Sequence, residues 1–100
     1  MTEKIQTIAI LGGTGDLGGG LARQWSRAGY QIYIGSRTID KGLAAASELL
    51  TEFPDLNVTG HDNISAAQLA DVVVLTVPFA HQLSTLESVK PALDGKVLID

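Results

Sequence analysis

Residues 11–21 form a glycine-rich segment, "LGGTGDLGGGL", that limits the possible folds of this chain more than any other part of the sequence. It follows the apolar run "TIAIL" and precedes a stretch whose apolar residues recur at helical spacing. Six glycines in eleven positions are costly inside a helix or strand, because glycine loses the most backbone freedom on folding. The segment is therefore expected to join a strand to a helix. Three explanations compete: a turn without a ligand, a phosphate loop of another class, or a dinucleotide site.

Short β-rich runs alternate with helix-period runs along the whole chain. The strands are expected at residues 7–11, 31–35, 56–60, 71–78 and 96–100, and the helices at 17–28, 39–53, 65–70 and 80–93, with Pro91 disturbing the end of the last. Strands separated by helices imply right-handed crossovers and a parallel sheet. We therefore predict an α/β fold of the Rossmann type, a doubly wound parallel sheet with strand order 3-2-1-4-5.

Individual residues in these elements carry further expectations. The second helix is expected to bury one apolar stripe, and Trp25 is expected to lie in the core. Gly29 is expected to end the first helix in a left-handed conformation. His61 is interpreted as a loop residue, and His81 as structural or exposed rather than catalytic. The residues of the stripe are Ile39, Leu43, Ala46, Leu50 and Phe53.

Composition excludes several classes of partner. The chain of 100 residues is 45% hydrophobic and 18% charged, as in globular domains, and its net charge of −4 with scattered basic residues argues against nucleic acid. The absence of cysteine removes thiolate catalysis and cysteine metal sites, and it fits a reducing cytoplasm. No apolar stretch approaches the roughly 20 residues that span a bilayer. We expect a cytoplasmic protein without nucleic-acid or membrane partners, and leave open whether it is a homo-oligomer.

Three of the glycines match the dinucleotide fingerprint G-x-G-x-x-G in the context that the motif requires. Gly13 would turn the chain tightly, Gly15 would let the backbone approach a pyrophosphate, and Gly18 would let the helix pack close to the strand. The pyrophosphate would lie at the helix N-terminus, where free N–H groups favour an anion. The missing G-K-[ST] excludes a P-loop, whereas the glycines alone do not exclude a methyltransferase.

The end of the second predicted strand bears on the choice of nucleotide. NAD enzymes place an acidic residue there for the ribose 2′-hydroxyl, but this chain has "GSR". Ser36 and Arg37 offer a hydroxyl and a guanidinium suited to a 2′-phosphate, and Lys41 adds a second cation one helical turn later. These residues favour NADP. The alternative is that Arg37 and Lys41 form a solvated face, while Ser36 or Thr38 caps a helix.

Three segments together resemble the NADP-binding domain of the F420-dependent NADP oxidoreductases: "IAILGGTGDLGGGLA", "IGSRTIDK" and "DVVVLTVPFAH". The resemblance covers nearly all of the chain. It implies that Ser36, Arg37 and Lys41 hold the 2′-phosphate, and that other residues line the phosphate loop or border the nucleotide. The implied loop residues are Thr14, Asp16 and Leu17, and the implied bordering residues are Val77, Pro78 and Phe79.

Two positions depart from that family's pattern. Asp16 stands where relatives have Asn, and its charge is expected to weaken pyrophosphate binding unless the side chain turns away. Phe79 stands where relatives have Trp, which is a milder change.

The resemblance implies an enzyme that transfers a hydride between NADP(H) and a small-molecule co-substrate, coenzyme F420. No catalytic residue is assigned, and no metal is expected. Two alternatives stay open: another NADPH-dependent reductase, acting on a hydroxy acid, an imine or a flavin, and a non-catalytic NADP-sensing module. We expect residues 1–100 to be the NADP-binding domain of a longer protein, incomplete at its C-terminal end.

Overall fold

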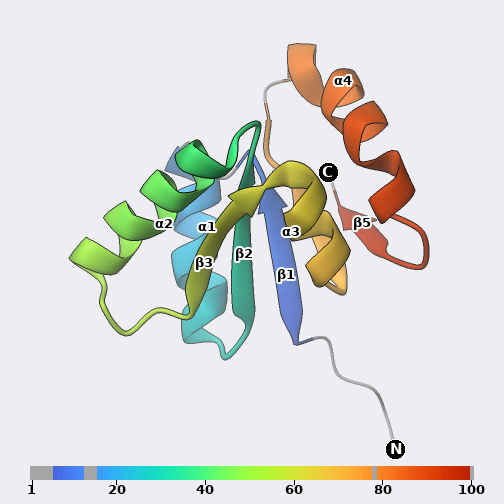
Figure 1. Cartoon of the computed structure of the whole chain (residues 1–100). Helices are drawn as coiled ribbons and strands as arrows, with labels where there is room; N and C mark the ends of the chain where they lie inside the picture. The colour runs from blue at the N-terminus through green and yellow to red at the C-terminus, as the bar shows by residue number, and fades with distance from the viewer. Residues whose placement is uncertain (1–5, 13–15, 78, 100) are drawn as a thin grey trace, which may run out of the picture.

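The computed structural model describes residues 6–12, 16–77 and 79–99. Within these ranges strands and helices alternate as the hydrophobic patterns predict (Figure 1). The elements are β1 (Thr7–Leu11), α1 (Asp16–Arg27), β2 (Gln31–Ser36), α2 (Ile39–Glu52), β3 (Val58–Asp62), α3 (Asn63–Leu69), β4 (Val72–Leu75), α4 (Phe79–Val89), a 3-10 turn η1 (Lys90–Ala92) and β5 (Val97–Ile99).

The five strands form one parallel sheet in the order β3-β2-β1-β4-β5, which confirms the predicted fold class and topology. β1 pairs with β2 on one side and with β4 on the other, so that Ile8 lies opposite both Ile32 and Val72. Because all the strands run the same way, their carboxyl ends meet at one edge of the sheet, at the top of Figure 1.

Alternation along the strands divides the core into two layers. Successive side chains of a strand point to opposite faces, so Ile8 and Ile10 face α1 and α2, whereas Ala9 and Leu11 face α3, α4 and η1. Figure 1 shows the two groups of helices on opposite sides of the sheet. A sheet covered on both faces explains why β4, with the sequence VVVL, is apolar throughout and fully buried.

Two predicted helix ends are confirmed. α1 ends at Arg27, and Gly29 follows with a φ of 107°, a conformation that favours glycine. Its N–H donates to the carbonyl of Ser26 at 3.1 Å. α4 ends at Val89, and Pro91 lies in the 3-10 turn that follows.

The third strand is displaced from its predicted position, and His61 is not a loop residue as expected. β3 extends through residues 60–62 because these pair with residues 34–36 of β2. Within this strand, His61 Nε2 lies 2.8 Å from the hydroxyl of Thr59, and its ring meets that of Tyr33 edge-on at 5.3 Å. Because of these contacts, we interpret His61 as a structural residue of β3.

The buried face of α2 also differs from the predicted stripe. Gly42, Ala45 and Ala46 are buried, whereas Ile39 and Leu43 are 44% and 51% exposed. The cause is a close approach of two backbones, since a Cβ on Gly42 would overlap the backbone of His61 and a Cβ on Gly60 would overlap that of Gly42. The line of closest contact therefore runs through residue 42. Trp25, expected in the core, is half-buried and packs against the core layer under α1 and α2.

Substitution by alanine is expected to change the free energy of unfolding in opposite directions at two helical glycines. Gly20→Ala in α1 should raise the free energy of unfolding by about 0.5–1 kcal/mol, because the added methyl meets no atom within 4 Å and alanine favours a helix. Gly42→Ala in α2 should lower it, because the methyl overlaps the His61 backbone. Urea denaturation of both variants tests the close packing of α2 on β3. Equal effects of the two substitutions would contradict that packing.

Candidate nucleotide-binding site

The loops after β1 and β4 meet at the carboxyl edge of the sheet. Gly12 has a φ of 77°, and its N–H donates to the Gly35 carbonyl at 2.9 Å. Thr76 donates to the Leu11 carbonyl from its backbone N at 3.0 Å and from its hydroxyl at 2.9 Å. The side chain of Val77 occupies the space that a Cβ on Gly12 would need. The neighbouring strands β1 and β4 thus diverge here toward helices on opposite faces, the place where open α/β sheets bind ligands.

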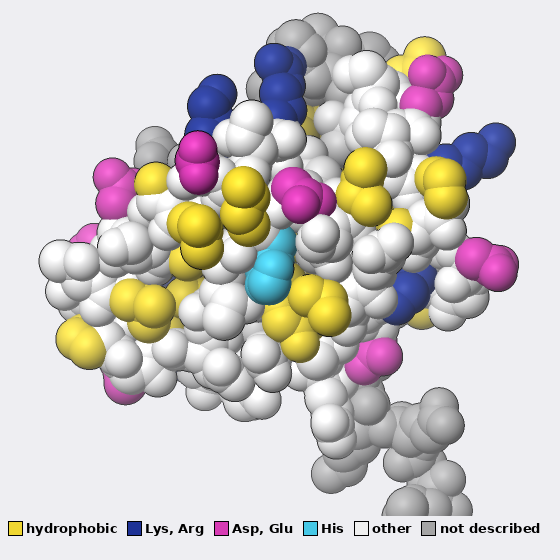
Figure 2. Space-filling view, viewed as in Figure 1, with side chains coloured by type: hydrophobic (Ala, Val, Ile, Leu, Met, Phe, Trp, Pro, Cys, Tyr) yellow, Lys and Arg dark blue, Asp and Glu magenta, His cyan; other side chains and the backbone are white. Residues whose placement is uncertain are grey.

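The residues that follow β2 have different roles: one caps α2, and two are exposed cations. Thr38 is the N-cap of α2, and its Oγ1 accepts a hydrogen bond from the Lys41 backbone N at 3.3 Å. Ser36, the last residue of β2, is only 6% exposed, while Arg37 and Lys41 are exposed. Figure 2 shows dark blue Lys and Arg side chains at the top of this face, where the strands of Figure 1 end. Of the two capping candidates, Thr38 is therefore the cap.

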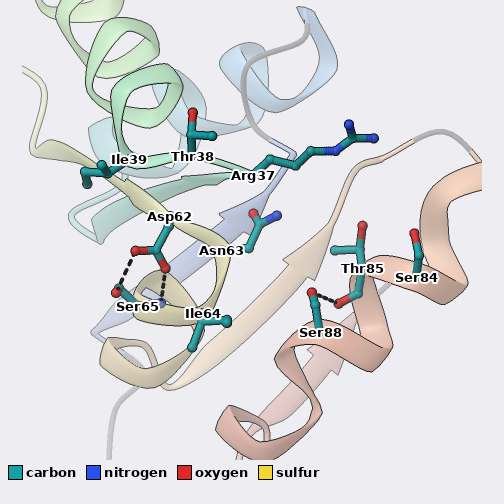
Figure 3. Close-up of a pocket in the computed structure, with 10 residues that line it drawn as sticks. All are labelled: Arg37, Thr38, Ile39, Asp62, Asn63, Ile64, Ser65, Ser84, Thr85 and Ser88. Carbon is teal, nitrogen blue, oxygen red and sulfur yellow. Dashed lines mark hydrogen bonds between the residues drawn. The ribbon is translucent and has the colours of Figure 1, made fainter.

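A pocket of about 750 Å³ opens beside these residues. Figure 3 shows that three segments line it: the start of α2, the junction of β3 with α3, and α4. Arg37 extends along its mouth without a hydrogen bond to the other residues drawn. The lining residues are Arg37, Thr38, Ile39, Asp62, Asn63, Ile64, Ser65, Ser84, Thr85 and Ser88.

Asp62 fixes the wall of the pocket formed by the β3–α3 junction. It is the N-cap of α3, and its carboxylate accepts hydrogen bonds from the Ser65 N–H at 2.8 Å and the Ser65 hydroxyl at 3.1 Å. The backbone hydrogen bond from Ser65 is the main reason that the pKa of Asp62 lies below its ordinary value of 3.8. Asp62 is therefore an anion at neutral pH.

A second hollow, of about 440 Å³, lies along the outer side of α2 and β3. Its lining runs along α2 from Leu43 to Thr51 and along β3 from Val58 to Gly60, and includes no charged side chain. It has no cation to meet a phosphate and is not at the carboxyl edge. The first pocket is therefore the better candidate for a nucleotide.

The structure places some of the predicted site residues and leaves others outside its description. Ser36 ends β2, Arg37 lines the pocket, and Lys41 lies in the first turn of α2, outside the pocket lining. Val77 lies beside Gly12. At the start of α1, Leu17 is 66% exposed and Gly18 is buried. Outside the described residues fall Gly13, Thr14, Gly15 and Pro78, and the side chains of Asp16, Phe79 and His81.

The sequence reasoning missed the wall of the pocket contributed by α3 and α4. An Asp followed by a helix is a capping signal, so "DNIS" could have placed Asp62 at a helix start. Asn63 could have been found as the residue that follows the third strand at the carboxyl edge. Thr85 and Ser88 lie within α4, and their sequence carries no comparable signal.

The described ranges contain neither a metal-binding cluster nor a membrane-spanning helix. There, no group of three or more His, Asp or Glu side chains could hold a metal ion. None of the helices in those ranges is long and apolar enough to cross a membrane.

Comparison with known proteins gives related sequences and structures. The chain is 52% identical over 95 residues to the F420-dependent NADP reductase of Methanothermobacter marburgensis, a match covering 93% of this chain and 42% of the relative. A solved structure from Arthrobacter sp. FB24, described as a candidate F420-dependent NADP reductase, is 30% identical with a TM-score of 0.78. That match covers 95% of this chain and 43% of the other.

A more distant relative carries a different name. The probable arogenate/prephenate dehydrogenase of Methanocaldococcus jannaschii is 34% identical over 95 residues, covering 94% of this chain and 20% of that protein. The chain thus spans less than half the length of each of these three proteins.

The family model described as "NADP oxidoreductase coenzyme F420-dependent" matches residues 7–100, which include β1, the charged residues after β2 and the strands β4 and β5. The match therefore extends over both halves of the sheet and over the pocket. The chain belongs to the family of F420-dependent NADP oxidoreductases.

Proposed function

We propose that this protein binds NADP(H) at the carboxyl edge of its sheet and transfers a hydride between NADP(H) and coenzyme F420. The observation that carries the proposal is the position of Arg37, which lines the 750 Å³ pocket and lies between Ser36, the last residue of β2, and Lys41, in the first turn of α2. Membership of the family supports the identity of the hydride acceptor. We also propose that the reaction takes place in the cytoplasm, in line with the lack of cysteine.

The residues at the edge supply the contacts that an NADP molecule needs. Gly12 leaves the backbone without a side chain where the loops after β1 and β4 approach each other. α1 begins at Asp16, and the free N–H groups at its start favour the pyrophosphate. The Arg37 fork and the Lys41 ammonium would neutralise the 2′-phosphate, and the Ser36 hydroxyl would donate to it.

Hydride transfer between these partners needs positioning more than proton chemistry. NADPH supplies a hydride, which together with a proton from solvent converts F420 to its reduced form and leaves NADP⁺. The residues of this chain would bind one end of the nucleotide firmly at β2. Val77, next to Gly12, would set where the nucleotide crosses from β1 to β4. Holding two flat rings close and in a fixed orientation accounts for the rate in such a reaction.

A second candidate is another NADPH-dependent reductase built on the same domain. The arogenate/prephenate dehydrogenase relative favours it, since that protein's name gives a different substrate over a similar domain. The third candidate is a sensor protein that binds NADPH as a signal and catalyses no reaction.

Nucleotide choice depends on the cations after β2. NADPH should bind more tightly than NADH, and Arg37→Ala should reduce that preference by on the order of 1.5–3 kcal/mol, the scale of a charge-assisted hydrogen bond. Calorimetric titration of both nucleotides measures the effect. Lys90→Ala is the control, because it removes an exposed positive charge in η1, outside the pocket lining. Equal affinities of the wild-type protein for NADPH and NADH would overturn the assignment of the 2′-phosphate site.

The acceptor is tested by mixing the intact protein, NADPH and oxidised F420 and following the loss of deazaflavin absorbance. Parallel reactions replace F420 with flavin mononucleotide or a 2-oxo acid. A further reaction contains prephenate with NADP⁺, because a prephenate dehydrogenase removes a hydride from its substrate and needs the oxidised nucleotide. We expect turnover of F420 and not of the other acceptors. Turnover of a 2-oxo acid or a flavin without F420 would establish the second candidate, and tight NADPH binding without any turnover would establish the third.

A further inference from the structure

Asn63 is a buried amide that the proposed contacts to NADP do not use. It is the first residue of α3, its side chain is 9% exposed, and Oδ1 finds no hydrogen-bond partner among the described residues. Leaving a buried polar group unsatisfied costs about 1–3 kcal/mol. Figure 3 shows the carboxamide pointing into the space below Arg37, with Thr85 across the pocket. A ligand in this pocket would give the amide the partner that it lacks.

The neighbouring strand is shaped to accept this side chain. Ser36 of β2 lies opposite Asp62, so Asn63 follows directly at the carboxyl edge. A Cβ on Gly35 would lie 2.8 Å from Asn63 Oδ1. The absence of a side chain at residue 35 therefore makes room for the amide at the floor of the pocket. Oδ1 itself is enclosed beside Gly35, and rotation about the Cβ–Cγ bond, a soft torsion in Asn, would turn it toward the pocket.

The charges around the pocket indicate what kind of group would meet Asn63. Asp62 is ionised, and its carboxylate is engaged by Ser65, so it would repel a phosphate at this end. A phosphate is accommodated instead at the Arg37 end. The group beside Asn63 should therefore be neutral, and it should offer a hydrogen-bond donor to the unsatisfied Oδ1. It should also be flat, because it must fit under the guanidinium of Arg37, which stacks on ring faces.

The adenine ring of NADP(H) has these properties. Its 6-amino group is a donor and the ring nitrogens beside it are acceptors, a pattern that the carboxamide of Asn matches. A volume of about 750 Å³ lies within the range of small-molecule sites. We propose that Asn63 recognises the base: its Oδ1 accepts a hydrogen bond from the 6-amino group of adenine, while Arg37 covers the ring. This inference rests on the proposed binding of NADP(H).

The test compares NADPH with reduced nicotinamide hypoxanthine dinucleotide phosphate, in which an oxo group replaces the 6-amino group. The oxo group is an acceptor and would face Oδ1. We expect wild-type protein to bind NADPH more tightly than the hypoxanthine analogue, by on the order of tenfold, because the analogue lacks the amino donor and forms one hydrogen bond fewer. Asn63→Ala should bring the ratio of the two dissociation constants close to one. Asn57→Ala, which changes an exposed Asn at the other end of β3, should leave the ratio unchanged.

Further measurements separate failure of this inference from failure of the proposed function. NADH is titrated against the same variants, and circular dichroism checks that each is folded; Asn63→Ser takes the place of Asn63→Ala if the latter does not fold. A wild-type protein that binds both purine nucleotides equally, or variants at residue 63 that keep the preference, would overturn the inference. A change in the NADPH to NADH ratio alone would assign Asn63 to the phosphate instead. A wild-type protein that binds neither NADPH nor its analogue would overturn the proposed function itself.

Discussion

Parallel hydrogen bonding of β1 to β2 on one side and to β4 on the other sets the frame of the sheet and the position of the site. It brings three strand ends to one edge, and the two crossovers leave that edge toward opposite faces of the sheet. The hydrogen bonds from Gly12 to Gly35 and from Thr76 to Leu11 tie the three ends together. Residues far apart in the sequence, such as Arg37 and Thr85, therefore face one pocket.

Close contacts at glycines shape the site at the carboxyl edge of the sheet. Gly12 admits the Val77 side chain, and Gly35 leaves space for the Asn63 amide. Gly42 and Gly60 allow α2 to lie directly on β3, which fixes the start of α2 beside the end of β2. Arg37 thus stands between a strand and a helix that are both held in place, and its exposed guanidinium pairs with none of the pocket residues drawn in Figure 3. A cation positioned in this way suits an anionic ligand better than an intramolecular ion pair.

The sequence predicted what depends on local pattern. The helix ends at Gly29 and Pro91, the sheet order and the strand runs other than the displaced third strand follow from periodicity and from the rules for parallel crossovers, and the structure confirms them. Features that depend on tertiary contact were wrong or missed. The apolar stripe of α2 was right for Ala46, Leu50 and Phe53, which are buried or pack against the core, and wrong for Ile39 and Leu43, because the start of the helix approaches β3 through Gly42. The unsatisfied Oδ1 of Asn63 was missed because its burial depends on packing against Gly35, which is distant in the sequence.

We propose that NADP(H) lies across the carboxyl edge, between β2, the start of α3 and α4. Backbone amide chemical shifts in the protein titrated with NADP⁺ test it most directly. We expect the largest changes at Gly35–Arg37, at Asn63–Ser65 and at Thr85, with little change at Leu50 and Thr59 in the outer hollow between α2 and β3. Changes concentrated at the outer hollow, or saturable binding that leaves the edge residues unshifted, would contradict it.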